Sequence, residues 1–289
     1  MSPAVIQAHG VTRKFGSLTA VDAVSIQVAP GEVVGLLGAN GAGKTTLIRM
    51  LLGLLDTTAG QVEVLGGPPD RAHRRRLGYV PQNLGLYRDL TVTENLEFIA
   101  VSYGATPPSL PDDLARYART PVSAVPLGAQ RRTAFLAAVA HNPEALLLDE
   151  PTSGVDVLSG AALWDTIRAQ SDRGVGALVT THNMQEAQQC DRLLLMSNGR
   201  LVAQGSEADI IGTTTALAVY SDDWATAFAA LNAAGVPVIL DGRAVRVADT
   251  DPTELDKILN AAGIAATTVP VPATIEERML VLARVPNAA

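Results

Sequence analysis

The sequence predicts an α/β protein whose main domain is built on a parallel sheet with a glycine-rich loop, followed by a small α+β domain. Three observations support this. Gly38 to Thr46 read G-A-N-G-A-G-K-T-T, between a strand-like and a helix-like segment. Two more apolar runs deliver Asp149 and Thr181 at their carboxyl ends, where open α/β sheets bind ligands. After Gly212 the pattern becomes β-α-β-β-α-β.

The glycine-rich loop fits the pattern G-x-x-x-x-G-K-(S/T), which wraps backbone N–H groups around nucleotide phosphates. Val33 to Leu37 is the expected buried strand, and the following helix aims the positive end of its dipole at an anion. Lys44 is expected to reach the terminal phosphates, and the Thr45 hydroxyl is expected to hold Mg²⁺. The residues expected to line the nucleotide are Gly38, Ala39, Asn40, Gly41, Ala42, Gly43, Lys44, Thr45 and Thr46.

Composition excludes several classes of protein. The 289 residues are 47% hydrophobic and 18% charged, as in an ordinary folded protein. A net charge of −7 argues against a nucleic-acid binder, which normally has a basic face. The single cysteine, Cys190, suits a reducing cytoplasm. We expect neither a signal peptide nor a membrane span, so any membrane role must come through a partner protein.

The first half of the chain contains short segments. Residues 4–36 predict short strands around turns, and residues 61–65 and 77–80 predict two further strands. For the three arginines at 74–76 we prefer a solvated helix face to an anion site. Thr91 and Glu94 predict a capping box. Prolines break residues 105–126, and a helix is expected from about Gln130 to Ala140.

Two apolar strands carry the polar residues with catalytic potential. Residues 145–148 are wholly apolar, as expected of a central parallel strand, and lead into Asp149 and Glu150. Asp149 is expected to hold Mg²⁺ through water, and Glu150 to polarise the attacking water. A second run, residues 177–180, leads into Thr181 and His182.

The run D-E-P-T-S-G-V-D, from Asp149 to Asp156, resembles the Walker B motif and D-loop of ATP-binding cassette (ABC) ATPases. The resemblance extends to about residue 205. It implies that Gln82 is the Q-loop glutamine, which contacts Mg²⁺ and senses a transmembrane partner. It also implies that His182 is the switch histidine at the γ-phosphate, and that Phe15 is the aromatic residue that stacks on adenine.

The family resemblance also implies an architecture. Residues 1–211 form the cassette, a P-loop NTPase with a RecA-like core, an antiparallel β subdomain and a shortened helical subdomain at about 86–135. Residues 212–289 form a ferredoxin-like accessory domain. Residues 85–96 and 181–192 resemble ATPases paired with ABC-2-type exporter permeases. The cofactors would be ATP and Mg²⁺. The protein would lie on the cytoplasmic face of the membrane, held there by permease subunits.

The segment that resembles the family signature departs from its pattern. In place of L-S-G-G-Q, the chain has Leu127, Gly128, Ala129 and Gln130 after Pro126. In the family this segment, with the D-loop aspartate that Asp156 matches, completes the ATP site of the opposite subunit. Leu127 cannot donate the serine hydrogen bond to phosphate, and it also removes a helix N-cap residue. Ala129 is expected to add a Cβ where the backbone should approach phosphate.

Several functional interpretations remain. The leading one is an ATPase subunit that drives a membrane exporter. We favour a heterodimer with a second ATPase subunit that carries an intact signature, and a homodimer is its rival. The alternatives from other classes are a weakly hydrolysing nucleotide switch and a soluble ABC protein without a transport role. The substrate is not encoded in this chain, because a membrane subunit selects it.

Overall fold

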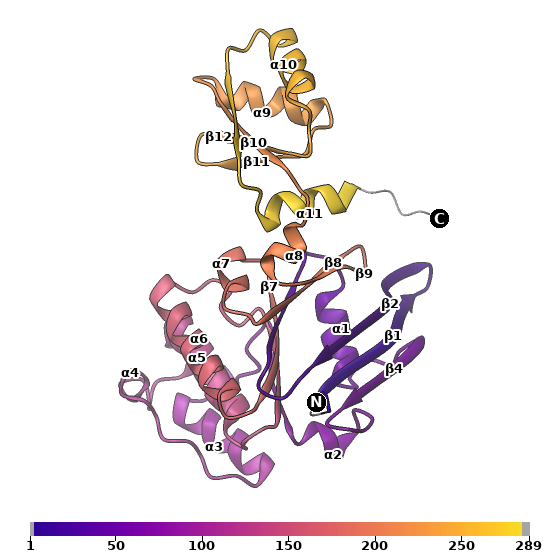
Figure 1. The fold of residues 1–289 in the computed structure, drawn as a ribbon. Helices are drawn as coiled ribbons and strands as arrows, with labels where there is room; N and C mark the ends of the chain where they lie inside the picture. Colours follow the sequence, from indigo (N-terminus) through magenta and orange to yellow (C-terminus); the bar gives the residue numbers. More distant parts are fainter. Residues whose placement is uncertain (1–2, 285–289) are drawn as a thin grey trace. The chain divides into compact units, whose positions relative to one another are not determined.

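The computed structural model describes residues 3–284, and the chain divides into two compact units, Met1–Leu201 and Val202–Ala289 (Figure 1). The division comes before the boundary expected after residue 211. Helix α8 (Glu207–Ile211) packs against α11 (Ile275–Arg284) and therefore belongs to the second unit. No helix in the described part of the chain is long and apolar enough to cross a membrane.

Strands β5, β6, β7, β3 and β8 form the centre of the first unit, in a six-stranded sheet with the order β5-β6-β7-β3-β8-β9 whose edge strand β9 continues past Leu201. The pairs from β5 to β8 are parallel, and every residue of β3, β6 and β7 is buried, as their apolar sequences predict. The strands are β3 (Val33–Leu37), β5 (Leu77–Val80), β6 (Ala145–Asp149), β7 (Gly176–Thr181), β8 (Arg192–Ser197) and β9 (Arg200–Gly205).

A second, antiparallel sheet has the order β2-β1-β4. The expectation of short strands over residues 4–36 is wrong here, because β1 (Ile6–Phe15) and β2 (Leu18–Val28) are long. Register shifts in their pairing interrupt the alternation of buried and exposed residues, from which strand length is judged. β4 (Ala59–Val64) completes the sheet. One apolar core joins this sheet, helix α1 (Lys44–Leu51) and the parallel sheet.

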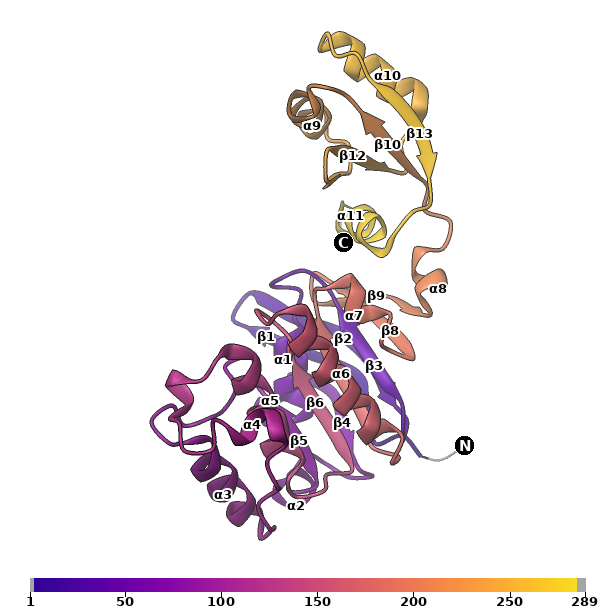
Figure 2. The ribbon, with the colours of Figure 1, turned by 90° about the vertical axis from the view of Figure 1, so that its left-hand side faces the viewer.

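Helices pack against the parallel sheet and also form a separate helical segment (Figure 2). The second core joins the sheet to α5 (Leu127–Val139) and α6 (Val157–Ser171). A small core of its own holds the helical segment together, and the predicted capping box of Thr91 and Glu94 opens its first helix. The remaining elements are α2 (Arg71–Arg74), α3 (Val92–Tyr103), α4 (Asp112–Ala115), the 3₁₀ helix η1 (Val122–Ala124) and α7 (Met184–Ala187).

Helix α5 begins earlier than predicted. Leu127 is its first helical residue, and Pro126 is the N-cap, with no side-chain hydrogen bond. The expectation that Leu127 replaces an N-cap residue is therefore wrong. Leu127 therefore leaves the N-cap position of α5 unchanged.

The second unit has the element order β-α-β-β-α-β, followed by α11. Its sheet has the order β11-β12-β10-β13, with antiparallel neighbours. A two-residue hairpin turn joins β11 to β12, because Asp241 pairs with Ala244 and Gly242 (φ 60°) takes the first central position. The elements are β10 (Ala216–Tyr220), α9 (Trp224–Ala233), β11 (Val238–Asp241), β12 (Ala244–Ala248), α10 (Pro252–Ala261) and β13 (Thr267–Val271).

A buried ion pair ties α11 to the sheet of the second unit. Arg246 Nε donates to Glu277 Oε1, and the two side chains are 13% and 0% exposed. The N–H and hydroxyl of Thr274 both donate to Glu277 Oε2, at 2.6 and 2.7 Å. Burial works to raise the pKa of Glu277, but the hydrogen bonds from Arg246 and Thr274 outweigh it, so the pKa is lowered. Glu277 is therefore held as a carboxylate.

Replacing Arg246 with alanine is expected to destabilise the second unit by about 3–5 kcal/mol, because it leaves a buried carboxylate without its cation. Because the folded-state pKa of Glu277 is depressed, the pair stabilises the fold above the unfolded pKa, and this contribution disappears as pH falls through the folded value. Urea unfolding followed by Trp224 fluorescence in a Trp164→Phe background measures both effects. The double variant Arg246→Leu/Glu277→Leu is the control. If it loses as much stability as Arg246→Ala, an uncompensated charge is not the cause.

Candidate nucleotide site

The glycine-rich loop connects β3 to α1 and is shaped by close backbone contacts. Gly38 has φ 153°, and a Cβ there would lie 2.4 Å from the Met196 carbonyl oxygen. Gly43 has φ 102° and would place a Cβ 2.5 Å from the Ala20 carbonyl oxygen. No hydrogen bond within residues 3–284 engages the N–H groups of Gly41 and Gly43. The loop thus presents free donors beside the N-terminus of α1, as a phosphate requires.

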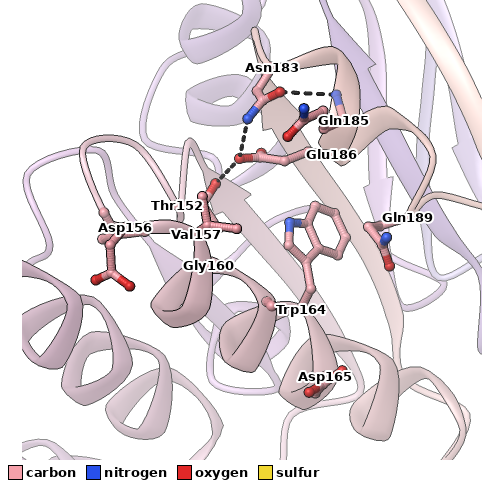
Figure 3. Close-up of a pocket in the computed structure, with 12 residues that line it drawn as sticks. Thr152, Asp156, Val157, Gly160, Trp164, Asp165, Asn183, Gln185, Glu186 and Gln189 are labelled. Atoms are coloured by element: carbon pink, nitrogen blue, oxygen red, sulfur yellow. Dashed lines mark hydrogen bonds between the residues drawn. The ribbon is translucent and has the colours of Figure 1, made fainter.

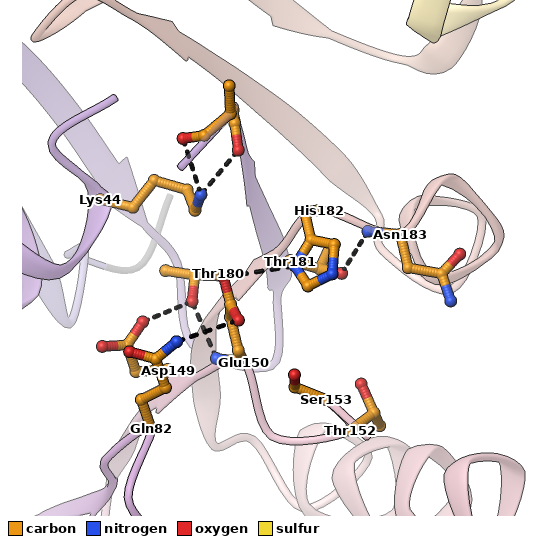
Figure 4. A network of polar contacts seen from close by, with 12 residues as sticks. Lys44, Gln82, Asp149, Glu150, Thr152, Ser153, Thr180, Thr181, His182 and Asn183 are labelled. Carbon is orange, nitrogen blue, oxygen red and sulfur yellow. Dashed lines mark hydrogen bonds and ion pairs between the residues drawn. The ribbon is translucent and has the colours of Figure 1, made fainter. Parts of the chain in front are cut away.

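Lys44 folds back over the loop that precedes it. Its ammonium donates to the carbonyl oxygens of Gly38, at 2.6 Å, and Ala39, at 3.2 Å (Figure 4). The side chain is buried, which lowers the pKa of Lys44, while the nearby Glu150 and Asp149 carboxylates oppose this shift. The ammonium is therefore held among the atoms that would surround a bound phosphate.

Thr180 contacts both acidic residues at the end of β6, namely Asp149, the last residue of the strand, and Glu150, which follows it. Thr180 pairs with Asp149 between the parallel strands β7 and β6, and its hydroxyl donates to Asp149 Oδ1 at 2.7 Å. The same hydroxyl oxygen accepts the backbone N–H of Glu150 at 2.9 Å. Sequence analysis missed this role. The signal was available, because Thr180 immediately precedes Thr181 and His182 at the end of a buried strand.

Glu150, which follows β6, contacts two polar side chains that follow the strands β5 and β7. Its Oε2 accepts from the Gln82 amide at 3.3 Å, and its Oε1 lies 3.3 Å from His182 Nδ1 (Figure 4). Glu150 itself has a left-handed backbone, with φ 51°, which costs free energy in a residue other than glycine. The strained backbone turns the carboxylate toward Gln82 and His182. The predicted catalytic residues are thus brought together.

The residues around Asp149 include ligands of the kind that Mg²⁺ prefers. Asp149 Oδ2 is buried and has no hydrogen-bond partner among the described residues, so this carboxylate oxygen is available to a bound ion or its water. Thr45 lines the pocket that Gln82 and Glu150 also border. Magnesium binds proteins through one or two carboxylates together with hydroxyls, waters and substrate phosphates. These residues fit that ion.

Arg131 supports the site through hydrogen bonds to the backbone on both sides of it, a role that the sequence did not predict. The buried guanidinium donates to the backbone carbonyls of Gln82, at 3.2 Å, and Ser153, at 3.1 Å. Burial lowers the pKa of Arg131, and the Glu150 carboxylate opposes that shift. Arg131 thereby links α5 to the segments on both sides of Glu150.

A pocket of about 470 Å³ extends from the loop to the β1–β2 turn. It is lined by Phe15, Leu18 and Ala20 at one end and by Gln82 and Glu150 at the other. Phe15 is 45% exposed, and the Arg13 guanidinium carbon lies 4.6 Å from the centre of its ring. A flat aromatic base placed at this end of the pocket would have Phe15 beside it.

The remaining predicted residues lie at the adjacent N-termini of α5 and α6. Leu127 is 39% exposed. Its side chain also packs against Gly154, because a Cβ added to Gly154 would lie 3.1 Å from Leu127 Cδ2. Gly128 faces Ser159, and Asp156 caps α6 by accepting the Ser159 N–H and hydroxyl, at 3.0 and 2.7 Å. The side chain of Gln130 donates to the Val125 carbonyl at 2.6 Å.

The side chain of Ala129 is half-buried and packs against the core of the helical segment, with Val92, Leu96 and Val125. This contact does not test how closely a phosphate approaches the backbone here. The expectation that the Ala129 Cβ obstructs that approach stays a prediction.

Comparison with known proteins settles the family. Residues 21–153 match the family model described as "ABC transporter". The Nod factor export ATP-binding protein I of Paraburkholderia xenovorans (strain LB400) is 40% identical over 228 residues, which are 74% of each chain. The chain belongs to the ABC transporter ATP-binding proteins.

Other relatives of this ABC cassette agree. The probable multidrug ABC transporter ATP-binding protein YbhF of Escherichia coli (strain K12) is 40% identical over 218 residues, which span 71% of this chain but only 38% of YbhF. A solved ATP-binding subunit of an ABC transporter superposes with a TM-score of 0.64, at 27% identity, over 72% of this chain and 92% of that one. The cassette MJ0796, solved as a dimer, has a TM-score of 0.62 at 24% identity and shares the fold.

Thr180→Val tests the polar network. The variant keeps the buried shape but removes the hydrogen bond to Asp149 and the acceptor for the Glu150 N–H. We expect kcat for ATP hydrolysis to fall by ~10–100-fold, since hydrogen bonds to charged groups contribute about 1.5–3 kcal/mol. The ATP dissociation constant should change little, because the loop is untouched. Thr166→Val, which removes a hydroxyl bonded only to backbone carbonyls in α6, is the matched control. Equal losses in both variants would contradict the assigned role.

Proposed function

We propose that this ABC cassette binds and hydrolyses ATP as one of two ATPase subunits, and that it powers an ABC-2-type membrane exporter. The observation that carries the proposal is the position of Glu150. Its carboxylate lies 3.3 Å from both the Gln82 amide and the His182 ring, at the border of the pocket that the phosphate-binding loop lines.

Binding of ATP uses the loop and its surroundings. The free N–H groups of Gly41 and Gly43 and the N-terminus of α1 receive the phosphates. Lys44 exchanges its contacts with the Gly38 and Ala39 carbonyls for phosphate oxygens. Phe15 stacks on adenine at the other end of the pocket.

Hydrolysis follows from the residues around Glu150. Mg²⁺, held by Thr45, Asp149 and Gln82, would neutralise phosphate charge when bound. Glu150 accepts a hydrogen bond from the attacking water and orients it. His182, whose ring lies 3.3 Å from the Glu150 carboxylate, contacts the γ-phosphate. Thr180 and Arg131 keep the carboxylate and the Q-loop in place.

A second ATPase subunit completes each site. We propose a heterodimer in which the partner supplies an intact signature to the site formed by Lys44, Glu150 and His182. In return, this chain offers Leu127, an exposed side chain with no hydroxyl, to the partner's ATP. The two sites are then unequal. The first hydrolyses ATP, and the second mainly holds it. A homodimer, with two impaired sites, is the competing arrangement.

The export role rests on resemblance to relatives. The printed names of the relatives describe Nod factor export and multidrug transport. Because the match spans 38% of YbhF, the activity of that whole protein is not transferred. Permease subunits on the inner face of the membrane remain the proposed partners. A weakly hydrolysing nucleotide switch is the second candidate, and the observation that favours it is the exposed Leu127.

Phe15→Leu tests adenine stacking. Base–aromatic stacking contributes ~1–3 kcal/mol, so the dissociation constant for ATP should rise by roughly 5–100-fold. Inorganic triphosphate, which has no base, serves as the matched ligand and should bind wild type and variant alike. Equilibrium titration measures both. The same loss for both ligands would place Phe15 in the fold and not in base recognition.

Leu127→Ser tests the unequal sites. The purified wild-type chain should hydrolyse ATP slowly, because every site in a homodimer receives Leu127. Restoring the serine hydroxyl should raise turnover by ~10–100-fold, the value of a hydrogen bond to a charged group. Leu54→Ser, at another exposed leucine, is the control and should change nothing. Fast turnover by wild type, unchanged in Leu127→Ser, would exclude the proposal.

A further inference from the structure

A second pocket, of about 360 Å³, lies between the N-terminal part of α6 and the segment around α7 (Figure 3). The residues that line it are Thr152, Val155, Asp156, Val157, Gly160, Ala161, Trp164, Asp165, Asn183, Gln185, Glu186 and Gln189. It shares no lining residue with the nucleotide pocket. A water molecule occupies roughly 30 Å³ in the liquid, so the pocket is far larger than one bridging water needs.

Two polar atoms at the base of this pocket are buried and have no hydrogen-bond partner among the described residues. They are Trp164 Nε1, a donor, and Glu186 Oε2, an acceptor. Trp164 is only 5% exposed, and its indole nitrogen is turned toward Thr152 and Glu186 (Figure 3). Buried polar groups normally have partners. A ligand that both accepts and donates hydrogen bonds would satisfy this pair.

The charge of the pocket specifies the ligand further. The acidic side chains of Asp156, Asp165 and Glu186 line it, and no lysine, arginine or histidine is among the lining residues that the structure describes. Glu186 has no ion pair in the described chain, and its other oxygen already accepts from Thr152 and Asn183. The side chains of Gln185 and Gln189, which also line the pocket, are exposed and carry no charge. The pocket therefore favours a cation.

We propose that this pocket binds an arginine side chain presented by a protein partner. The guanidinium carries five N–H donors in a planar fork and matches a carboxylate such as Glu186. A peptide carbonyl next to the arginine would accept the Trp164 N–H. Arginine on a peptide thus supplies the donor and the acceptor that the two buried atoms lack.

A ligand in this pocket would contact a residue, Glu186, that links the segments carrying Glu150 and His182. Glu186 contacts Thr152, two residues after Glu150, and Asn183, the residue after His182. A guanidinium on Glu186 Oε2 fixes the carboxylate that joins these two segments. The partner's arginine therefore holds the Glu150 and His182 segments at a constant separation. This inference is independent of the proposed exporter role.

Trp164 allows binding to be measured directly. In a Trp224→Phe background it is the sole tryptophan, because the chain has two. We expect N-acetyl-L-arginine amide to change its fluorescence with a saturable titration curve. N-acetyl-L-citrulline amide has nearly the same shape but no charge, and should bind at least ~10-fold more weakly. Glu186→Gln should reduce arginine binding by a similar factor and remove most of the discrimination.

Two results would overturn the proposal, each judged on protein that still binds ATP. One is a titration with the arginine amide that shows no saturable change. The other is equal binding of the arginine and citrulline amides. Asp165→Asn, at an exposed rim position, guards against misfolding of Glu186→Gln and should weaken arginine binding without affecting the citrulline amide. Unchanged arginine binding in both variants also rejects the site. Failure of any of these tests leaves the nucleotide site as it stands.

Discussion

The parallel pairing of β6, β7 and β3 is the constraint on which the catalytic centre depends. Asp149 pairs with Thr180, and Thr180 in turn pairs with Leu36, just before the phosphate-binding loop. Parallel strands end at the same edge, so three segments far apart in sequence deliver their polar residues to one place. A shift by one residue in this ladder would turn Thr180 away from Asp149 and remove the support of Glu150.

The sequence predicts the parts of this site whose chemistry is local. A buried strand, a glycine-rich turn and a helix follow one another within Val33–Leu51, so the loop could be recognised without tertiary information. The apolar run before Asp149 and the order of elements after Gly212 are equally local. The lengths of β1 and β2 were underestimated, because register shifts between Ala8 and Lys14 break the alternation from which strand length is judged.

The remaining features depend on contacts distant in sequence. Arg131 reaches Gln82 and Ser153 only because α5 packs beside both segments, and no local pattern distinguishes it from Arg132. The left-handed backbone of Glu150 is invisible in sequence, since glutamate rarely adopts it. The start of α5 was predicted too late for a related reason, because helix termini are the least predictable part of an element.

Helix α5 has two separable roles. Its buried face braces this chain's own site, where Arg131 holds the Gln82 and Ser153 carbonyls. Its N-terminus is exposed and presents Leu127 to whatever lies opposite. A substitution at residue 127 can therefore alter what the chain contributes to a partner's nucleotide without disturbing Glu150, Gln82 or His182. Because the helix start does not depend on the residue 127 side chain for a cap, the change carries little cost in stability. In the proposed heterodimer, asymmetry between the two ATP sites would thus require only one exposed residue to change.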